Sequence, residues 1–239
     1  MKNLLILSLI FLFFTPVHSQ SKIQIEKERA LYRDNKVKIQ TIDYPEGRKE
    51  VTKFNKNGAP IESHDYYDSE EVNATNYIYD KKGFLIEQTH YGYYSGDGDK
   101  TNYYYNEQGD ITKTKTVFFE DNETFYEYGG HGNLVKTKSI YTVSPDEPSI
   151  ITEYNNISKD EKLIFKEIVC GTHTEDVKQF KFNYEGSTLV LIEEFTKNCF
   201  SGTLMFTNKT TIVYFPNGLT KEVIQNQNSD KDIYTYEFY

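Results

Sequence analysis

The chain has 239 residues, with 27 Lys and Arg against 36 Asp and Glu, and this formal charge of −9 disfavours a protein that neutralises nucleic-acid phosphates. Aromatic residues make up 15% of the chain, as 21 Tyr and 16 Phe without Trp, while hydrophobic residues make up only 37%. This composition excludes collagen-like and coiled-coil chains, and the aromatic content also excludes a strongly disordered one.

Residues 1–19 have the pattern of a secretory signal peptide. A basic residue precedes an apolar run at residues 4–14, and Val17 and Ser19 place small side chains before the expected cleavage point. The run is shorter than the roughly 20 residues that span a bilayer, and no later stretch is apolar enough for a transmembrane helix. We therefore expect an exported chain whose mature part, residues 20–239, forms a single domain.

The mature part repeats a short turn motif, which consists of an aromatic residue, a turn residue, two variable residues, glycine, any residue and an aliphatic residue. Good copies begin at Tyr79, Tyr105 and Tyr128, and a looser copy is assigned to Tyr32. In such a turn an Asp or Asn side chain bonds the backbone two residues on, and glycine supplies the positive φ. The motif predicts hairpin turns at Gly58, Gly83, Gly109, Gly132, Gly186 and Gly218.

Aromatic residues recur at alternate positions before these turns, which places them on one face of each predicted strand. The other face is mixed in polarity, which indicates that it is half-solvated. The aromatic face has two interpretations: it is the core of a repeat array, which its position beside every turn favours, or it is a surface that covers a partner or stacks on sugars. Its predicted members are Tyr77, Tyr79, Tyr103, Tyr105, Tyr126, Tyr128, Tyr184 and Tyr214.

The pattern that begins at Tyr79 and ends at Leu85, repeated between Tyr105 and Ile111, resembles the YD repeat of the RHS/YD-repeat proteins. This resemblance implies an all-β fold of tandem antiparallel β-hairpins that form an extended, twisted or curled sheet. Seven to nine hairpins would give about fourteen to eighteen strands, since each hairpin contributes two. The family's encapsulation of a toxin is not implied, because the chain is too short for that large shell and no toxin domain follows the repeats.

Two other all-β folds stay open as alternatives. One is an ordinary β-sandwich with glycine-rich turns, and the other is an outer-membrane β-barrel. A lipid-facing strand needs apolar residues at alternate positions, whereas residues 109–118 carry Asp and Thr at one set of positions and two Lys at the other. The sequence therefore favours the hairpin array over the membrane barrel.

The two cysteines, Cys170 and Cys199, can pair only with each other. The predicted strands place them at the same end of the sheet, two strands apart, so we expect a disulfide if a loop curls to close that gap, and two unpaired buried thiols otherwise. Asp97 and Asp99 have the Asp-x-Asp spacing of a calcium loop but lack its remaining ligands. A solvated acidic loop tip is favoured, and we expect no metal and no other cofactor.

No catalytic motif is present in the sequence, and its histidines are dispersed. The leader, rich in Leu and Phe, and the abundance of Asn, Lys, Ile and Tyr are typical of export in Gram-negative Bacteroidota. We expect a protein without enzymatic activity in the periplasm, at the outer membrane or on the cell surface, where it acts as a binding or structural component. Its expected partner is another envelope protein, with a surface glycan as the alternative, and nucleic acid is not expected.

Overall fold

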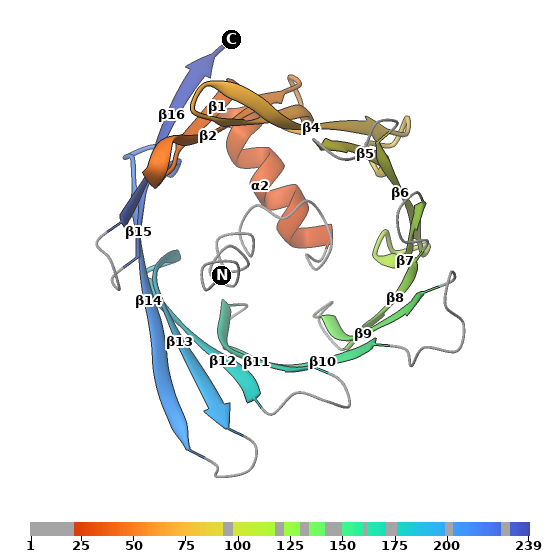
Figure 1. Cartoon of the computed structure of the whole chain (residues 1–239), viewed down its shortest axis with the longest axis vertical. Coiled ribbons are helices and arrows are strands. Elements are labelled where there is room, and N and C mark those ends of the chain that lie inside the picture. Colours follow the sequence, from red (N-terminus) through yellow and green to blue (C-terminus); the bar gives the residue numbers. More distant parts are fainter. Residues whose placement is uncertain are drawn as a thin grey trace.

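The computed structural model describes residues 22–92, 98–117, 122–129, 134–141, 150–159, 162–170, 176–198, 203–225 and 230–239. Sixteen strands lie in these ranges; each pairs antiparallel with the next, and β1 also pairs with β16, so the sheet closes into a barrel (Figure 1). The predicted all-β array of antiparallel hairpins is confirmed, and closure is more specific than the predicted twisted or curled sheet. The strands are β1 (Val37–Asp43), β2 (Arg48–Phe54), β3 (Pro60–Tyr67), β4 (Glu70–Tyr79), β5 (Leu85–Gly92), β6 (Asp99–Tyr105), β7 (Ile111–Val117), β8 (Asn122–Tyr128), β9 (Leu134–Tyr141), β10 (Ile150–Lys159), β11 (Lys162–Cys170), β12 (Asp176–Glu185), β13 (Thr188–Asn198), β14 (Leu204–Tyr214), β15 (Thr220–Gln225) and β16 (Asp230–Phe238).

One turn geometry recurs between the strands. At the β4–β5 turn the Asp80 carboxylate accepts the backbone N–H groups of Lys82 at 2.8 Å and Phe84 at 2.9 Å. Gly83 has a φ of 86° and donates its N–H to the Asp80 carbonyl at 3.0 Å. This backbone bond, together with a second from the N–H of the first turn residue to the carbonyl four residues on, also closes the turns that begin at Asn55, Asn106 and Phe215. The repeated motif therefore encodes a repeated backbone conformation.

The barrel has two different ends. The repeated turns, together with the β12–β13 turn, lie at one end, which we call the turn rim. The connection between β1 and β2, which contains the short 3₁₀ helix η1 (Pro45–Gly47), and the β3–β4 turn at Asp68 and Ser69 lie at the other end, the loop rim. A strand of seven residues such as β1 separates the two rims by about 23 Å.

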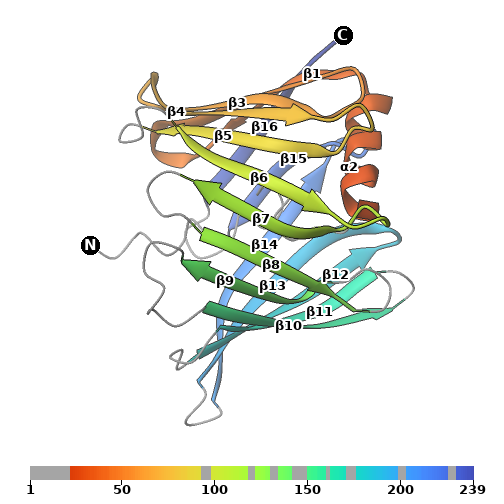
Figure 2. The ribbon, with the colours of Figure 1, turned by 90° about the vertical axis from the view of Figure 1, so that its right-hand side faces the viewer.

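The helix α2 (Lys22–Asp34) lies across the turn rim, as the side view shows (Figure 2). It was not predicted, and the repeat copy assigned to Tyr32 is wrong, because Tyr32 lies in the last turns of this helix rather than in a strand. The segment contains Glu, Lys, Arg, Ala and Leu, which favour helix, and lacks the glycine of the repeat. The helix propensity of the whole segment therefore determines its structure, and the short likeness to the turn motif does not.

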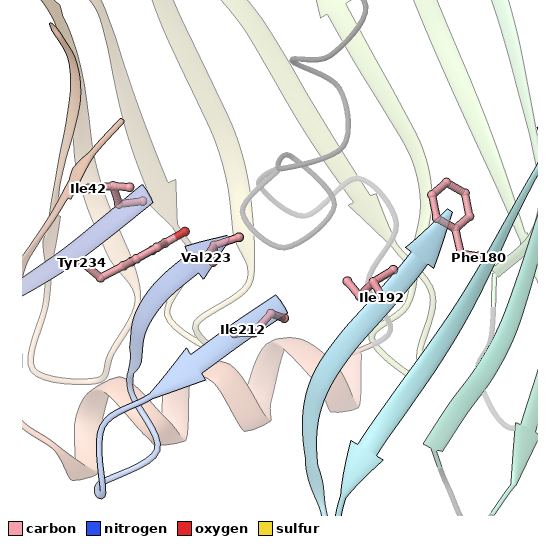
Figure 3. Close-up of a cluster of buried hydrophobic side chains, with 6 residues drawn as sticks. All are labelled: Ile42, Phe180, Ile192, Ile212, Val223 and Tyr234. Atoms are coloured by element: carbon pink, nitrogen blue, oxygen red, sulfur yellow. The ribbon is translucent and has the colours of Figure 1, made fainter. Parts of the chain in front are cut away.

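The position of α2 identifies the inner wall of the barrel. The Gln40 side chain donates to the Tyr32 hydroxyl at 3.2 Å and to the Tyr236 hydroxyl at 3.1 Å, so Gln40 faces the helix. Since residues two apart share a strand face, Ile42 and Tyr234 also face inward. The buried cluster drawn in Figure 3 continues along this wall and contains Ile42, Phe180, Ile192, Ile212, Val223 and Tyr234.

The buried side chains form three separate clusters in the described part of the chain, rather than one continuous core. Several aromatic residues that pack against them, including Tyr77, Tyr105 and Tyr128, are only partly buried. A barrel of sixteen strands is too wide for its own side chains to fill its centre. The inner wall is thus a curved layer of side chains around a wide interior.

The outer wall carries rows of oppositely charged residues. Lys100 pairs with Glu87 at 2.7 Å, Lys136 pairs with Glu153 at 3.6 Å, and further pairs join neighbouring strands around the barrel. All these residues belong to the strand face opposite the inner wall. Exposed pairs of this kind contribute little stability individually, and exposed apolar side chains such as Ile78, Tyr104 and Phe125 lie on the same wall. Other such pairs are Lys49 with Asp43, Lys53 with Glu62, Lys113 and Lys115 with Glu123, and Lys231 with Glu222.

Candidate functional site

The predicted aromatic face lies on the inner wall, beside the turn rim. Six of its tyrosines belong to or pack against one buried cluster, Tyr214 packs against the cluster of Figure 3, and Tyr184 lies near the end of β12. Burial raises the pKa of Tyr79 and Tyr214 to about 12, so their phenols are protonated at neutral pH. The six tyrosines of the first cluster are Tyr77, Tyr79, Tyr103, Tyr105, Tyr126 and Tyr128.

The hydroxyl of the motif tyrosine binds the backbone of the preceding hairpin. Tyr79 donates to the Pro60 carbonyl and Tyr105 donates to the Leu85 carbonyl, each at 2.8 Å. Each of these carbonyls belongs to the first residue of the strand that follows the previous turn. The tyrosines therefore link successive hairpins, and this contact explains why the motif requires Tyr at these positions.

The turn glycines allow helix α2 to approach the rim. A Cβ atom on Gly58, whose φ is 77°, would lie 2.1 Å from the Arg29 carbonyl oxygen. The Arg29 side chain reaches the next turn, where it donates to the Gly83 carbonyl at 2.7 Å and lies 4.9 Å from the centre of the Tyr79 ring. Gly109 and Gly218 also adjoin the helix, whereas Gly186 does not. Most of the predicted turn and aromatic residues are thus structural.

A cleft of about 520 Å³ lies on the loop rim, which we call the rim cleft. Two tyrosines, two acids and two bases line it, so it is a mixed polar and aromatic surface of the size that small ligands or peptide side chains occupy. Its backbone comes from the β1–β2 connection and the β3–β4 turn. The lining residues are Asp43, Tyr44, Gly47, Arg48, Lys49, Val51, Tyr66, Asp68 and Ser69.

Behind the rim cleft, the Glu50 carboxylate lies at the centre of a hydrogen-bond network on the inner wall. It accepts the Tyr44 hydroxyl at 3.0 Å, and the Thr52 and Ser63 hydroxyls at 3.1 Å each. Burial raises the pKa of Glu50, and the neighbouring carboxylate of Asp65 raises it further, while the three hydroxyl groups lower it. The network fixes an acid in a place where water is largely excluded.

Arg48 connects this network to the cleft. Its guanidinium group lies 4.6 Å from the Tyr44 ring centre and 3.6 Å from the Asp65 carboxylate. On β16, which β1 separates from β2, Asp232 is 2% exposed, and its Oδ2 has no hydrogen-bond partner among the described residues. Burial raises the pKa of Asp232 to about 6, although the charge of Arg48 opposes this shift.

The sequence did not identify these cleft and network residues, because they come from four strands and two connections that share no local motif. The closure of β16 onto β1 brings Asp232 beside a pair of strands that lie almost 190 positions earlier in the chain. Only the Pro45-Glu46-Gly47 turn was visible as a local signal, and it indicates a connection rather than a site.

The other predicted site residues are only partly described. Asp99 begins β6 at the loop rim, and Asp97 lies outside the described residues, as do Gly132 and Cys199. The Cys170 backbone ends β11, and its side chain is not described, so the disulfide stays a prediction. Within the described ranges no group of three or more His, Cys, Asp or Glu residues could hold a metal ion. In the same ranges no helix is both long and apolar enough to cross a membrane.

Comparison with known proteins shows no family for this chain, since no family model and no curated protein matches it. Three solved structures illustrate the backbone similarities. A porin-like protein from Bacteroides uniformis has a TM-score of 0.38 and 10% identity, over 85% of this chain and 97% of that one. TcdB2-TccC3 has a TM-score of 0.37 and 9% identity, and the Photorhabdus luminescens Tc holotoxin pore with a TccC3 mutation has 0.31 and 13%. This chain spans only 12% of the length of either toxin chain, and because every TM-score is below 0.5, no function is transferred from them.

Proposed function

We propose that this chain is an exported, non-catalytic binding component of a Gram-negative bacterial envelope, whose barrel receives a segment of another envelope protein at the loop rim. The observation that supports this best is the contrast between the two walls. The outer wall carries paired charges among exposed apolar side chains, whereas the inner wall carries aromatic residues and a hydrogen-bonded carboxylate network around Glu50. Helix α2 occupies the turn rim, so a partner would meet the barrel at the loop rim.

The two other functions weighed from the sequence have less support. A lipid-spanning barrel would need an uninterrupted apolar belt on its outer wall, whereas here Lys and Glu pairs interrupt the exposed apolar side chains such as Ile78, Tyr104 and Phe125. A glycan-binding face would need tyrosine hydroxyls that are free to bind sugars, and those of Tyr79 and Tyr105 are bound to backbone carbonyls. The paired charges also favour a chain that works in water, and export to an envelope compartment rests on residues 1–19.

Cross-linking of the full chain in intact envelopes, followed by mass spectrometry, tests this function. The inner-wall variant Thr75→Trp would obstruct the interior, and the adjacent outer-wall variant Ala74→Trp is the matched control. We expect one reproducible protein partner, whose yield falls at least tenfold in Thr75→Trp and stays within twofold in Ala74→Trp. If Thr75→Trp does not fold, Thr101→Trp on the same wall replaces it.

Equal capture by the inner-wall and outer-wall variants, or the absence of any partner, would contradict the proposal. Its compartment is tested separately, by sequencing the N-terminus of the exported protein. An N-terminus at Gln20 in the envelope fraction supports export, whereas an intact N-terminus in the cytoplasmic fraction opposes it.

A further inference from the structure

Strands β13 and β14 form a hairpin that extends beyond the loop rim. Each has eleven residues, more than any other strand in the described part of the chain, and the hairpin leaves the ring of strands in both views (Figure 1 and Figure 2). We propose that the open edge of this hairpin binds an extended segment of the partner protein as an additional β-strand. This inference rests on the proposed function, because it names the way in which the partner segment is held at the loop rim.

Six residues of β14 have a neighbouring strand on one side only. On the β13 side the pairing runs from Leu204 to Thr211, whereas on the β15 side it begins at Thr210. No other described strand pairs with residues 204–209, so this stretch, about 20 Å long, is an open edge of the sheet. Alternate residues of an antiparallel strand direct their N–H and C=O groups to opposite sides. The open edge therefore presents a row of backbone groups that an extended chain can pair with.

Apolar side chains lie on both faces of the open edge. Leu204, Met205 and Phe206 are consecutive and alternate between the two faces, yet they are 46%, 52% and 55% exposed. Phe206 pairs in register with Phe195, and the two ring centres lie 5.7 Å apart in an edge-to-face contact. Natural proteins avoid exposed apolar edges because they promote aggregation. Where such an edge accepts a partner strand, main-chain bonds give affinity and the alternate side chains give specificity.

The size and charge of the open edge identify its occupant. Six residues are far fewer than the roughly 20 residues that each partner contributes to a stable complex, so this edge alone would not hold a second copy of the chain. The charges beside the edge are largely balanced, since Lys209 lies opposite Glu193 in the register and Glu194 lies 3.4 Å from Lys178. The occupant that fits is thus a mainly apolar, extended segment of a larger protein, recognised through its backbone.

Titration of the full chain with two blocked heptapeptides, followed by amide NMR, tests the inference. In one peptide valine alternates with threonine. The other is the same peptide with every amide nitrogen methylated, which keeps the side chains but cannot donate to a strand edge. We expect the first peptide to shift the amide resonances of residues 204–209 and to bind at least tenfold more tightly than the second.

A pair of matched variants locates the binding. Phe206→Lys should weaken binding of the first peptide about fivefold, because it removes an apolar contact from the open edge. Phe125→Lys should leave the affinity unchanged, because Phe125 is also exposed on the outer wall but has a paired strand on each side.

Equal binding of both peptides, or no shift at residues 204–209, overturns the inference. So does a dimer of the full chain in analytical ultracentrifugation that Phe206→Lys dissociates, because the edge would then hold a second copy. Binding to vesicles of phosphatidylethanolamine and phosphatidylglycerol that Phe206→Lys abolishes also overturns it, since the apolar residues would then contact lipid.

Capture in envelopes separates this inference from the proposed function. Partner capture that survives Phe206→Lys removes the inference and leaves the proposed function intact. Binding of the first peptide at the open edge without any captured partner has the opposite meaning, since it removes the proposed function alone.

Discussion

Replacement of Asp232 by Asn should stabilise the barrel at neutral and alkaline pH. The pKa of this carboxyl rises from 3.8 to about 6 on folding, chiefly because burial disfavours its charged form. A shift of about two units corresponds to roughly 3 kcal/mol of stability lost when the group is ionised. Since the new amide is itself incompletely hydrogen-bonded, we expect a net gain of about 2 kcal/mol in the free energy of unfolding at pH 8.

The gain should depend on pH in a defined direction. The native carboxyl binds its proton more tightly than the unfolded one, so the wild-type protein loses stability as pH rises between about 4 and 6. The Asn variant does not titrate there, and its advantage should vanish near pH 4 and be complete above pH 7. Urea denaturation at several pH values measures the free energy of unfolding of the wild-type protein and of the variant. The difference between the two values at each pH removes the contribution of other acids such as Glu50, which both proteins share.

The matched control is Glu237→Gln, later on the same strand, where the side chain is exposed. We expect it to change the free energy of unfolding by less than about 0.5 kcal/mol at either pH. A gain for Asp232→Asn that is the same at pH 4 and pH 8, or a loss at pH 8, would refute the reasoning, because burial of an unpaired charge would then not be the cause.

Three further predictions concern the contacts that hold the hairpins together, and each is measured as the free energy of unfolding in urea. Arg29→Ala should cost about 2 kcal/mol, because it removes a charged hydrogen bond to a turn and a contact with a ring, whereas Lys27→Ala on the exposed side of the same helix should cost little. Gly58→Ala should cost at least about 2 kcal/mol more than Gly186→Ala, because only the first Cβ overlaps the helix backbone; equal costs would contradict the contact with α2. Tyr105→Phe should cost about 1 kcal/mol through the lost hydroxyl bond, and an unchanged value would remove the proposed link between hairpins.

The local structure could be read from the sequence where one residue type has one physical role. Asp80 and Gly83 predicted a turn because an Asx side chain and a positive φ are local requirements, and the structure has both. The alternation of Tyr77 and Tyr79 predicted a shared strand face for the same reason. Neither inference needed knowledge of how distant strands meet.

Closure and the rim cleft depend on contacts that no local pattern records. The pairing of β1 with β16 sets Ile42 beside Tyr234, and a repeat period does not fix the curvature that brings them together. The helix at Lys22–Asp34 has a related explanation. The residues next to Tyr32 in sequence resemble the turn motif, but Tyr32 lies in the helix and its hydroxyl accepts a hydrogen bond from Gln40 on the barrel wall. Barrel closure, the rim cleft and the position of the helix therefore depend on long-range contacts, which local sequence patterns do not predict.

The position of Asp232 joins the stability of the barrel to its proposed function. A buried carboxylate whose Oδ2 accepts no hydrogen bond from a described residue opposes folding at neutral pH, and it lies on the inner wall toward the loop rim rather than among the hairpin contacts at the turn rim. Natural proteins retain such destabilising groups at sites where they bind a ligand. If Asp232→Asn raises stability and also lowers capture of the envelope partner, both effects have one origin, the charge of this carboxylate. If stability rises while partner capture stays the same, the Asp232 carboxylate does not contribute to recognition, and its cost is one of folding alone.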